Sequence, residues 1–341
     1  MKYILKNQEE IRRKKNEKST NLYFIKGETL MEKQHLIQKI IEQMEKVIIG
    51  KREVLELTIV ALISEGHILL EDVPGVGKTT LANALAHTIH SGFSRIQFTP
   101  DTLPSDITGM TIYNMQNGQF EFVKGQIMNH IILADEINRT SPKTQASLLE
   151  AMEERQVTID SKSYPLPKPF MVIATQNPID YLGTYSLPEA QLDRFLMKLS
   201  IGYPDKQSEM QMVQSFLGDS TWKQLDYVVE EADVIAMIGE VQLVKVHPDL
   251  IDYTLRIIEE TRNNSALSLG ASPRATLALN RSAQALAYMK GRDFVIPDDI
   301  RTMVIPVLGH RLVLSSEAKL NQQTPEKLLK AILTKIKQPI L

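Results

Sequence analysis

A glycine-rich stretch that ends in lysine and threonine carries the strongest chemical signal in the sequence, Pro74-Gly75-Val76-Gly77-Lys78-Thr79-Thr80. Backbone N–H groups of such a loop, with the N-terminus of a following helix, cradle phosphate groups. Lys78 can reach β- and γ-phosphates, and the Thr79 hydroxyl is placed to ligate Mg²⁺. Asp72 stands where the G-x-x-x-x-G-K-[ST] pattern has its first glycine. The alternative is a glycine turn that caps a helix, but a buried strand before the loop and a helix after it favour nucleotide binding.

Two adjacent carboxylates, Asp135 and Glu136, end the apolar run Ile131-Ile132-Leu133-Ala134. If this run is a buried strand of a parallel sheet, both carboxylates lie at the carboxyl edge, where ligands of open α/β folds bind. Asp135 would hold Mg²⁺ through its water shell, and Glu136 would orient and polarise an attacking water. In isolation such a pair is usually a strand that meets a polar loop. Beside a phosphate loop it indicates hydrolysis.

Three further polar residues follow at positions that could reach the same phosphates. Asn177, after the apolar strand Met171–Ala174, could hydrogen-bond the attacking water or the γ-phosphate, although Asn-Pro is also a turn dipeptide. Arg194 could form a structural ion pair, or it could act as an arginine finger on an adjacent subunit. Arg274, just inside a helix opened by Ser272-Pro273, could be a solvated first-turn residue or could reach phosphate across a domain cleft.

The elements that must position these residues are short buried strands that alternate with helices, which is typical of a parallel sheet covered on both faces. The pattern predicts strands over 67–72, 95–99, 130–133, 170–174 and 198–201, and helices over 78–90 and 142–155. After Tyr203-Pro204 the strand signals fade and helical periodicity dominates. We therefore predict an αβα core over 31–204 and a smaller helical domain over 205–341.

Residues 1–30 differ from the rest of the chain, because they carry eight basic and four acidic side chains and few apolar ones. Such a segment cannot bury enough surface to offset the entropy lost on ordering. We predict a mobile or partly helical N-terminal extension, which is dispensable because Met31 opens a better amphipathic pattern.

The composition excludes several classes of protein. Lys and Arg number 39 and Asp and Glu number 41, which gives no global attraction to nucleic acid or to an anionic membrane. The absence of cysteine excludes disulfides, thiolate metal sites and cysteine nucleophiles. No apolar run approaches the roughly 20 residues that span a bilayer, and the N-terminus lacks the apolar region of a secretion signal. We predict a cytoplasmic protein with no membrane span and no nucleic-acid partner.

Taken together, five stretches make residues 31–341 resemble the MoxR group of the AAA+ ATPases. The stretches are L-E-D-V-P-G-V-G-K-T (70–79), L-A-D-E-I-N-R-T-S-P-K (133–143), L-E-A-M-E-E (149–154), A-T-Q-N-P (174–178) and L-P-E-A-Q-L-D-R-F (187–195). The resemblance implies an α/β fold: a P-loop AAA+ core, with a parallel five-stranded sheet flanked by helices, followed by a small all-α lid domain. Asp72 in place of the first glycine fits this group.

The resemblance also implies a role for each motif residue. Lys78 and Thr79 match Walker A, Asp135 and Glu136 match Walker B, Asn177 matches sensor 1, Arg194 matches the trans-acting arginine finger and Arg274 matches sensor 2. The stretch Val47-Ile48-Ile49-Gly50 resembles the segment that packs near adenine. The expected nucleotide-binding residues are therefore Ile48, Ile49, Gly50, Pro74, Gly75, Val76, Gly77, Lys78, Thr79 and Thr80, and the expected Mg²⁺ ligands are Thr79 and Asp135.

Two inserted hairpins are implied as well, at 110–123 with an Asn117-Gly118 turn and at 156–169. In related proteins such insertions project into a central pore or toward a client, although both could be ordinary surface hairpins. The implied function is Mg²⁺-dependent ATP hydrolysis by a homo-oligomer, most simply a hexameric ring. It would act as a chaperone that matures or activates partner complexes, often with von Willebrand factor A (VWA) domains. The alternatives are a chelatase-type subunit that drives metal insertion and a DNA-acting AAA+ motor.

Overall fold

The computed structural model describes residues 26–177, 185–217 and 225–340. Helix α2 spans Lys26–Glu45, so the helix begins before Met31, where we placed the end of the N-terminal extension. The remainder of that predicted extension, residues 1–25, lies outside the described residues. In the described part of the chain, no helix is both long enough and apolar enough to cross a membrane.

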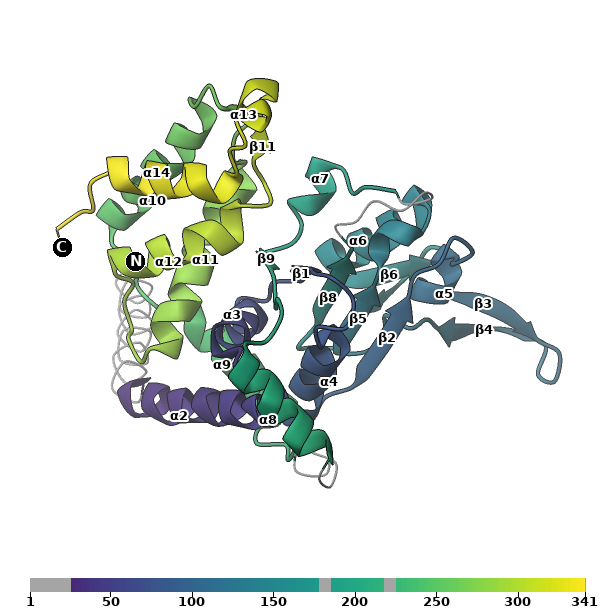
Figure 1. Cartoon of the computed structure of the whole chain (residues 1–341). Helices are drawn as coiled ribbons and strands as arrows, with labels where there is room; N and C mark the ends of the chain where they lie inside the picture. The colour runs from purple at the N-terminus through teal and green to yellow at the C-terminus, as the bar shows by residue number, and fades with distance from the viewer. Residues whose placement is uncertain (1–25, 178–184, 218–224, 341) are drawn as a thin grey trace, which may run out of the picture.

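A five-stranded parallel sheet forms the centre of the N-terminal part of the chain (Figure 1). Its strands, in spatial order, are β2 (Phe93–Gln97), β5 (Ile131–Asp135), β8 (Met171–Gln176), β1 (Ile68–Glu71) and β9 (Met197–Leu199). All neighbouring pairs run parallel. The predicted fold class is thereby confirmed. Because β8 lies between β5 and β1, the carboxyl ends of these three strands are neighbours, and each is followed by a predicted site segment.

Alternate residues of the strands pack on opposite faces of the sheet, as the period of a β-strand requires. Ile68 and Leu70 face a cluster that includes helices α3 and α4, whereas Leu69 faces a cluster that includes helix α6. The first cluster continues without interruption into the interior of the C-terminal helices. The sheet and the C-terminal helices therefore share one apolar core.

Helices cover both faces of the sheet and form most of the C-terminal part. Those of the sheet region are α3 (Arg52–Ile63), α4 (Lys78–Thr88), α5 (Pro104–Thr108), the 3-10 helix η1 (Ile137–Arg139), α6 (Pro142–Glu154) and α7 (Glu189–Leu192). Those that follow are α8 (Lys206–Leu217), α9 (Glu231–Val241), α10 (Pro248–Arg262), α11 (Pro273–Met289), α12 (Pro297–Leu308), α13 (Ser316–Leu320) and α14 (Pro325–Lys335). This C-terminal part also holds a short antiparallel pair, β10 (Leu267–Leu269) with β11 (Val313–Leu314), which the sequence did not predict.

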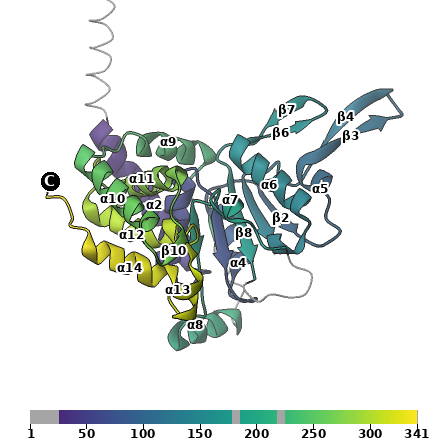
Figure 2. The same ribbon diagram turned by 90° about the horizontal axis from the view of Figure 1, so that it is seen from above.

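Two hairpins stand out from the sheet on the same side of the molecule (Figure 2). They are β3 (Gly109–Asn114) with β4 (Gln119–Lys124), and β6 (Gln156–Ile159) with β7 (Lys162–Pro165). The β3–β4 hairpin extends one residue beyond the predicted segment 110–123 at each end, and the β6–β7 hairpin lies within the predicted segment 156–169. The ring of Phe122 stacks on that of Tyr164, with centroids 4.0 Å apart, so the two hairpins contact each other through aromatic side chains.

A buried histidine, His67, ties the start of β1 to its neighbours. Its Nδ1 accepts a hydrogen bond from Val172 N–H at 3.0 Å, so the proton lies on Nε2, which donates to the Met152 carbonyl oxygen at 3.1 Å. Burial, and to a smaller extent the nearby Arg155 charge, lower the pKa of His67 to about 3. The histidine therefore stays neutral in the folded protein at every ordinary pH.

This histidine should make the protein less stable in mild acid. The unfolded chain binds a proton at His67 below its ordinary pKa of 6.5, whereas the folded chain stays neutral until about pH 3. The free energy of unfolding should therefore fall by about 2 kcal/mol between pH 7.5 and pH 5 from this residue alone. Urea unfolding at the two pH values measures the change.

The matched variant is His67→Gln, because the glutamine amide offers one acceptor and one donor but does not titrate in this range. Its loss of stability between pH 7.5 and pH 5 should be smaller than that of the wild type by about 2 kcal/mol. An equal loss in both proteins would show that His67 does not set the pH dependence. His310, which is also buried with a pKa held well below its ordinary value by burial, is present in both proteins and cancels in the comparison.

Candidate nucleotide-hydrolysis site

A cavity of about 410 Å³ opens at the carboxyl ends of β1, β5 and β8. It is lined by Pro74, Gly75, Gly77, Lys78, Thr79, Thr80, Arg95, Asp135, Glu136 and Asn177. Nine of these ten residues were singled out from the sequence, and the topology of the sheet brings them together from three separate stretches of the chain. Arg95, on β2, is the one that the motifs did not indicate.

The loop between β1 and α4 has the backbone that its glycines allow. Gly75 and Gly77 have φ angles of +87° and +95°, a region that favours glycine. A Cβ at Gly75 would meet no atom within 4 Å, so the backbone conformation, and not crowding, accounts for this glycine. The Val76 side chain packs against the core, which leaves the backbone of the loop to face the cavity.

Lys78 begins helix α4 at the floor of the cavity. Its Nζ donates a hydrogen bond to the carbonyl oxygen of Asp72 at 2.7 Å. Partial burial lowers the pKa of Lys78, and the negative charges of Asp72, Asp135 and Glu136 oppose that lowering. The ammonium thus lies among carboxylates, in a position from which it can move to a phosphate.

Thr175, at the end of β8, joins the two carboxylates of β5 to the neighbouring strand. Its hydroxyl donates to Asp135 Oδ1 at 2.7 Å and accepts from the Glu136 N–H at 2.8 Å. Arg95 binds the other oxygen of Asp135, with Nη2 at 2.7 Å from Oδ2. Asp135 is therefore held from both sides, and Asn177 follows Thr175 by two residues on the same strand end.

Glu136 turns into the cavity because its backbone adopts a left-handed conformation, with φ +58°. Its Oε2 accepts hydrogen bonds from Arg139 Nη1 at 2.7 Å and from Gln97 Nε2 at 3.2 Å. A non-glycine residue with positive φ is uncommon and is found often at functional sites. The backbone of Glu136 thus separates its carboxylate from that of Asp135.

The residues present fit a magnesium ion that is bound together with a nucleotide. Mg²⁺ prefers oxygen ligands and is usually held by one or two carboxylates plus substrate phosphates, with water completing the shell. The Thr79 hydroxyl and the Asp135 carboxylate both line the cavity beside the phosphate loop. The described residues contain no group of three or more His, Asp or Glu that could hold a metal ion.

The segment expected near adenine lies beside the loop. Ile48 is buried in the core, and its Cδ1 lies 4.0 Å from the point that a Cβ of Gly77 would occupy. Ile49 is half-buried and Gly50 is exposed. Among the described residues, the lining of the 410 Å³ cavity includes none of these three, so their contact with a nucleotide stays a prediction.

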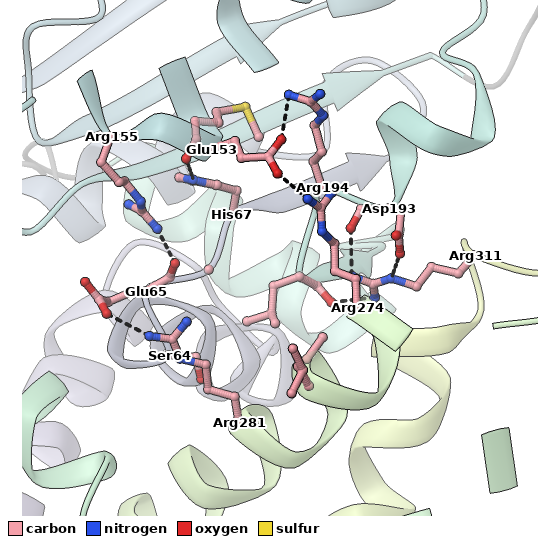
Figure 3. Close-up of a pocket in the computed structure, with 15 residues that line it drawn as sticks. Ser64, Glu65, His67, Glu153, Arg155, Asp193, Arg194, Arg274, Arg281 and Arg311 are labelled. Carbon is pink, nitrogen blue, oxygen red and sulfur yellow. Dashed lines mark hydrogen bonds and ion pairs between the residues drawn. The ribbon is translucent and has the colours of Figure 1, made fainter. Parts of the chain in front are cut away.

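The two predicted arginines, Arg194 and Arg274, lie in a different pocket, of about 350 Å³, between the sheet and α11 (Figure 3). Both guanidinium groups point to the carboxylate of Glu153, at the end of α6, and Arg194 Nη1 lies 3.0 Å from Glu153 Oε2. Arg194 also donates to the carbonyl oxygen of Leu149 at 2.9 Å. The structure thus brings the two arginines to each other and not to Lys78 of the same chain. Arg274 lines this second pocket and does not line the cavity that contains the phosphate loop of its own chain.

A second ion pair fixes the backbone beside these arginines. Arg311, which is buried, binds Asp193 Oδ1 at 2.7 Å and the Phe195 carbonyl oxygen at 2.6 Å. Ser272 donates to the other oxygen of Asp193 at 2.9 Å. Residues 193–195 are therefore held by the C-terminal helices, a role that sequence reasoning did not give to Arg311.

Sequence comparison agrees with this geometry. Residues 67–197 match the family model described as "ATPase family associated with various cellular activities (AAA)", and residues 259–332 match the model described as "AAA lid domain". The fold and the cavity define a P-loop ATPase of the AAA+ class with an AAA lid.

Similar proteins identify the family within the AAA+ class. The chain is 47% identical to YeaC of Bacillus subtilis over 305 residues, which cover 89% of this chain and 95% of that protein. It is 39% identical to Chaperone MoxR1 of Mycobacterium tuberculosis over 322 residues, which cover 92% of this chain and 85% of that protein. The crystal structure of a candidate ATPase from Cytophaga hutchinsonii, 38% identical, superposes with a TM-score of 0.86 over 92% of this chain and 98% of that one. The chain belongs to the MoxR family of AAA+ ATPases.

Proposed function

We propose that this protein hydrolyses ATP to ADP and phosphate in a Mg²⁺-dependent reaction, as a ring that remodels partner proteins. The observation that carries the chemical part is one cavity lined by Lys78, Asp135, Glu136 and Asn177 at the carboxyl edge of the sheet. Phosphoryl transfer to water requires a cation that binds the phosphates and a carboxylate that binds the metal. It also requires a second carboxylate and an amide that orient the water.

Each residue has one task in this proposal. Glu136 accepts a hydrogen bond from the attacking water and orients it in line with the β–γ bond, and Asn177 donates to the water or to the γ-phosphate. Lys78 leaves the carbonyl oxygen of Asp72 and binds the β- and γ-phosphates, where it stabilises the charge that develops in the transition state. Mg²⁺ would be held by Thr79 and Asp135 together with the nucleotide, and would neutralise part of the phosphate charge. The Asp135 carboxylate, which pairs with Arg95, would present an acceptor to that ion.

The arginines support a site that is shared between subunits. Arg194 and Arg274 lie on one carboxylate, Glu153, outside the cavity of their own chain. The two cations share the single carboxylate of Glu153, so their charge is only partly neutralised within this cluster, which suits the γ-phosphate of a nucleotide bound to a neighbouring subunit. A head-to-tail contact that repeats and closes makes a ring, and the family resemblance favours a hexamer.

The hairpins support a role on partner proteins. Tyr113, Met115 and Phe120 of the β3–β4 hairpin are exposed, Met115 at 91% and Phe120 at 74%. Exposed apolar side chains on a projecting element are typical of interaction surfaces. We propose that this hairpin contacts the client, and that clients include proteins with VWA domains, as the family resemblance implies.

The shared site predicts that specific ATPase activity depends on protein concentration. Activity per subunit should rise with concentration in the presence of Mg²⁺ and reach a plateau when rings are complete, because a lone subunit lacks its neighbour's arginines. Steady-state phosphate release, measured beside the mass of the species by light scattering, tests this. Activity that is constant per subunit in solutions that contain only monomer would contradict the shared site, and an inert protein at every concentration would contradict unassisted ATP hydrolysis.

A further inference from the structure

Asp72, the residue that replaces the first glycine of the phosphate-loop pattern, has its carboxylate buried at the end of β1. Three donors surround it. Oδ1 accepts from the Ser200 hydroxyl at 2.7 Å and from the Gly202 N–H at 3.0 Å, and Oδ2 accepts from the Ile201 N–H at 2.7 Å. Hydrogen bonds to an ionised carboxylate are about twice as strong as those between neutral groups.

These donors lie where the chain leaves the sheet for the C-terminal helices. Strand β9 ends at Leu199, and helix α8 begins at Lys206. The sheet itself already joins β1 to β9 as far as the pair Leu70↔Leu199. The Asp72 carboxylate acts beyond that last pair, on residues 200–202, where Gly202 takes a φ of +62°. The carboxylate therefore adds a connection that the strand pairing does not provide.

The segment from Ser200 to Ser208, which we name the linker and which includes the first residues of α8, also contacts the end of the segment expected near adenine. Lys51 Nζ donates to the Tyr203 carbonyl oxygen at 2.8 Å. A side chain at Gly50, in the segment expected near adenine, would collide with Ser208. The linker is therefore held on one side by the end of β1 and on the other by the residues that follow Ile49.

The backbone of Asp72 meets the phosphate-binding cation. Its carbonyl oxygen accepts the hydrogen bond from Lys78 Nζ at 2.7 Å. A nucleotide that draws the ammonium to its phosphates removes this bond, while the carboxylate of the same residue stays attached to the linker. One residue thus contacts both the group that senses phosphate and the segment that leads to the lid.

We propose that Asp72 is a positioning residue that couples phosphate binding at Lys78 to the position of the linker, and through it to the lid. The proposal rests on the ATPase function given above. A glycine at this position, as in the general P-loop pattern, would keep the phosphate loop but would leave the donors of residues 200–202 without their carboxylate. Coupling between two sites by a shared element is commonly worth a factor of five to about 150 in an equilibrium constant.

The test compares Asp72→Gly, Asp72→Asn and Glu71→Gln with the wild type in the full chain. Asparagine keeps one oxygen acceptor and should restore part of the linkage. Glu71 is the matched control, because its carboxylate pairs with Lys198 of β9, at 2.8 Å, within the strands and not on the linker. The chain has no cysteine, so Lys143→Cys on α6 and Lys330→Cys on α14, both exposed, take a pair of fluorophores without competing thiols.

Energy transfer between the two dyes is measured with and without MgATP, beside kcat, KM and the midpoint of thermal unfolding. The Asp72→Gly protein should bind MgATP with a KM within about threefold of the wild type, but its kcat should fall about tenfold and the nucleotide-dependent change in transfer should be lost. For Asp72→Asn, both kcat and the change in energy transfer should lie between those of Asp72→Gly and those of the wild type. Glu71→Gln should behave as the wild type in both measurements.

Two results would overturn the inference. One is an Asp72→Gly protein that keeps the wild-type change in energy transfer and the wild-type kcat. The other is a loss of kcat in all variants that follows only their loss of thermal stability, because Asp72 would then be a purely structural residue. A wild-type protein that shows no ATP hydrolysis would instead refute the proposed function, so the two failures are distinguishable.

Discussion

Replacing Glu136 by glutamine is expected to lower the rate of ATP hydrolysis by about 10²- to 10⁴-fold, with ATP binding retained. The carboxylate lies in the cavity with Lys78 and Asn177, and Arg139 and Gln97 hold it through Oε2. Glutamine has nearly the same shape and can still contact Arg139 through its carbonyl oxygen. It loses the negative charge that polarises the water, so the chemical step should fail while the phosphate contacts of Lys78 remain.

Phosphate release and the affinity for a fluorescent ATP analogue, measured on the same samples, check this result. Glu259→Gln, an exposed change on α10 far along the chain from the cavity, is the control for a lost carboxylate and should leave both quantities unchanged. Hydrolysis by Glu136→Gln at close to the wild-type rate would remove Glu136 from the mechanism. Equal losses of hydrolysis and of binding would give it a binding role instead.

The same variant provides a test for clients, because a ring that holds ATP without turnover should keep its partner bound. Purified VWA-domain proteins are the probes, and their co-elution with the Glu136→Gln ring in ATP is the expected result. The double variant Glu136→Gln with Phe120→Ser should capture less, since Phe120 is an exposed aromatic of the projecting hairpin. Capture that does not depend on Phe120 would place the client contact elsewhere.

Much of this site could be predicted from the sequence, because its residues sit at the ends of buried strands. The strand ending at Asp135 and the strand ending before Asn177 are apolar and short, and parallel strands bring their carboxyl ends to one edge. The order β5-β8-β1 then places both beside the phosphate loop. Local patterns were sufficient here, because the topology of such sheets leaves few other arrangements.

Contacts between residues far apart in the sequence could not be predicted in the same way. Asp72 meets residues 200–202, and Glu153 meets Arg194 and Arg274, through contacts that span more than a hundred positions in two of these cases. The sequence around a carboxylate does not indicate which distant donor that carboxylate will bind. Glu153 lies in the stretch L-E-A-M-E-E (149–154), a family signature that does not indicate which arginines this carboxylate binds. The position of Arg274 away from its own phosphate loop depends on how the C-terminal helices pack, which no local pattern specifies.

Because this packing keeps Arg194 away from the phosphate loop of its own chain, we expect Arg194 to act on the nucleotide of a neighbouring subunit. Arg194→Ala should lower hydrolysis by about 10³- to 10⁵-fold, the usual worth of an arginine finger. The loss alone does not distinguish a shared site from a damaged fold, because Arg194 also binds Glu153 and the Leu149 carbonyl oxygen. A mixing experiment makes that distinction.

Arg194→Ala subunits keep Glu136, and Glu136→Gln subunits keep Arg194, so each preparation alone should be inactive. If the two form mixed rings, an Arg194→Ala subunit that stands beside a Glu136→Gln neighbour receives an intact arginine. At equal amounts, about a quarter of all head-to-tail contacts should then carry a complete site, and activity should reappear on mixing. Arg274→Ala should be rescued in the same way, because both arginines lie on Glu153. A chain that carries both Glu136→Gln and Arg194→Ala is the control, because it cannot form a complete site when it is mixed with either single variant. Because a site built within one chain would gain nothing from a neighbour, the absence of any recovery in mixed rings would show that these arginines do not act across the subunit boundary.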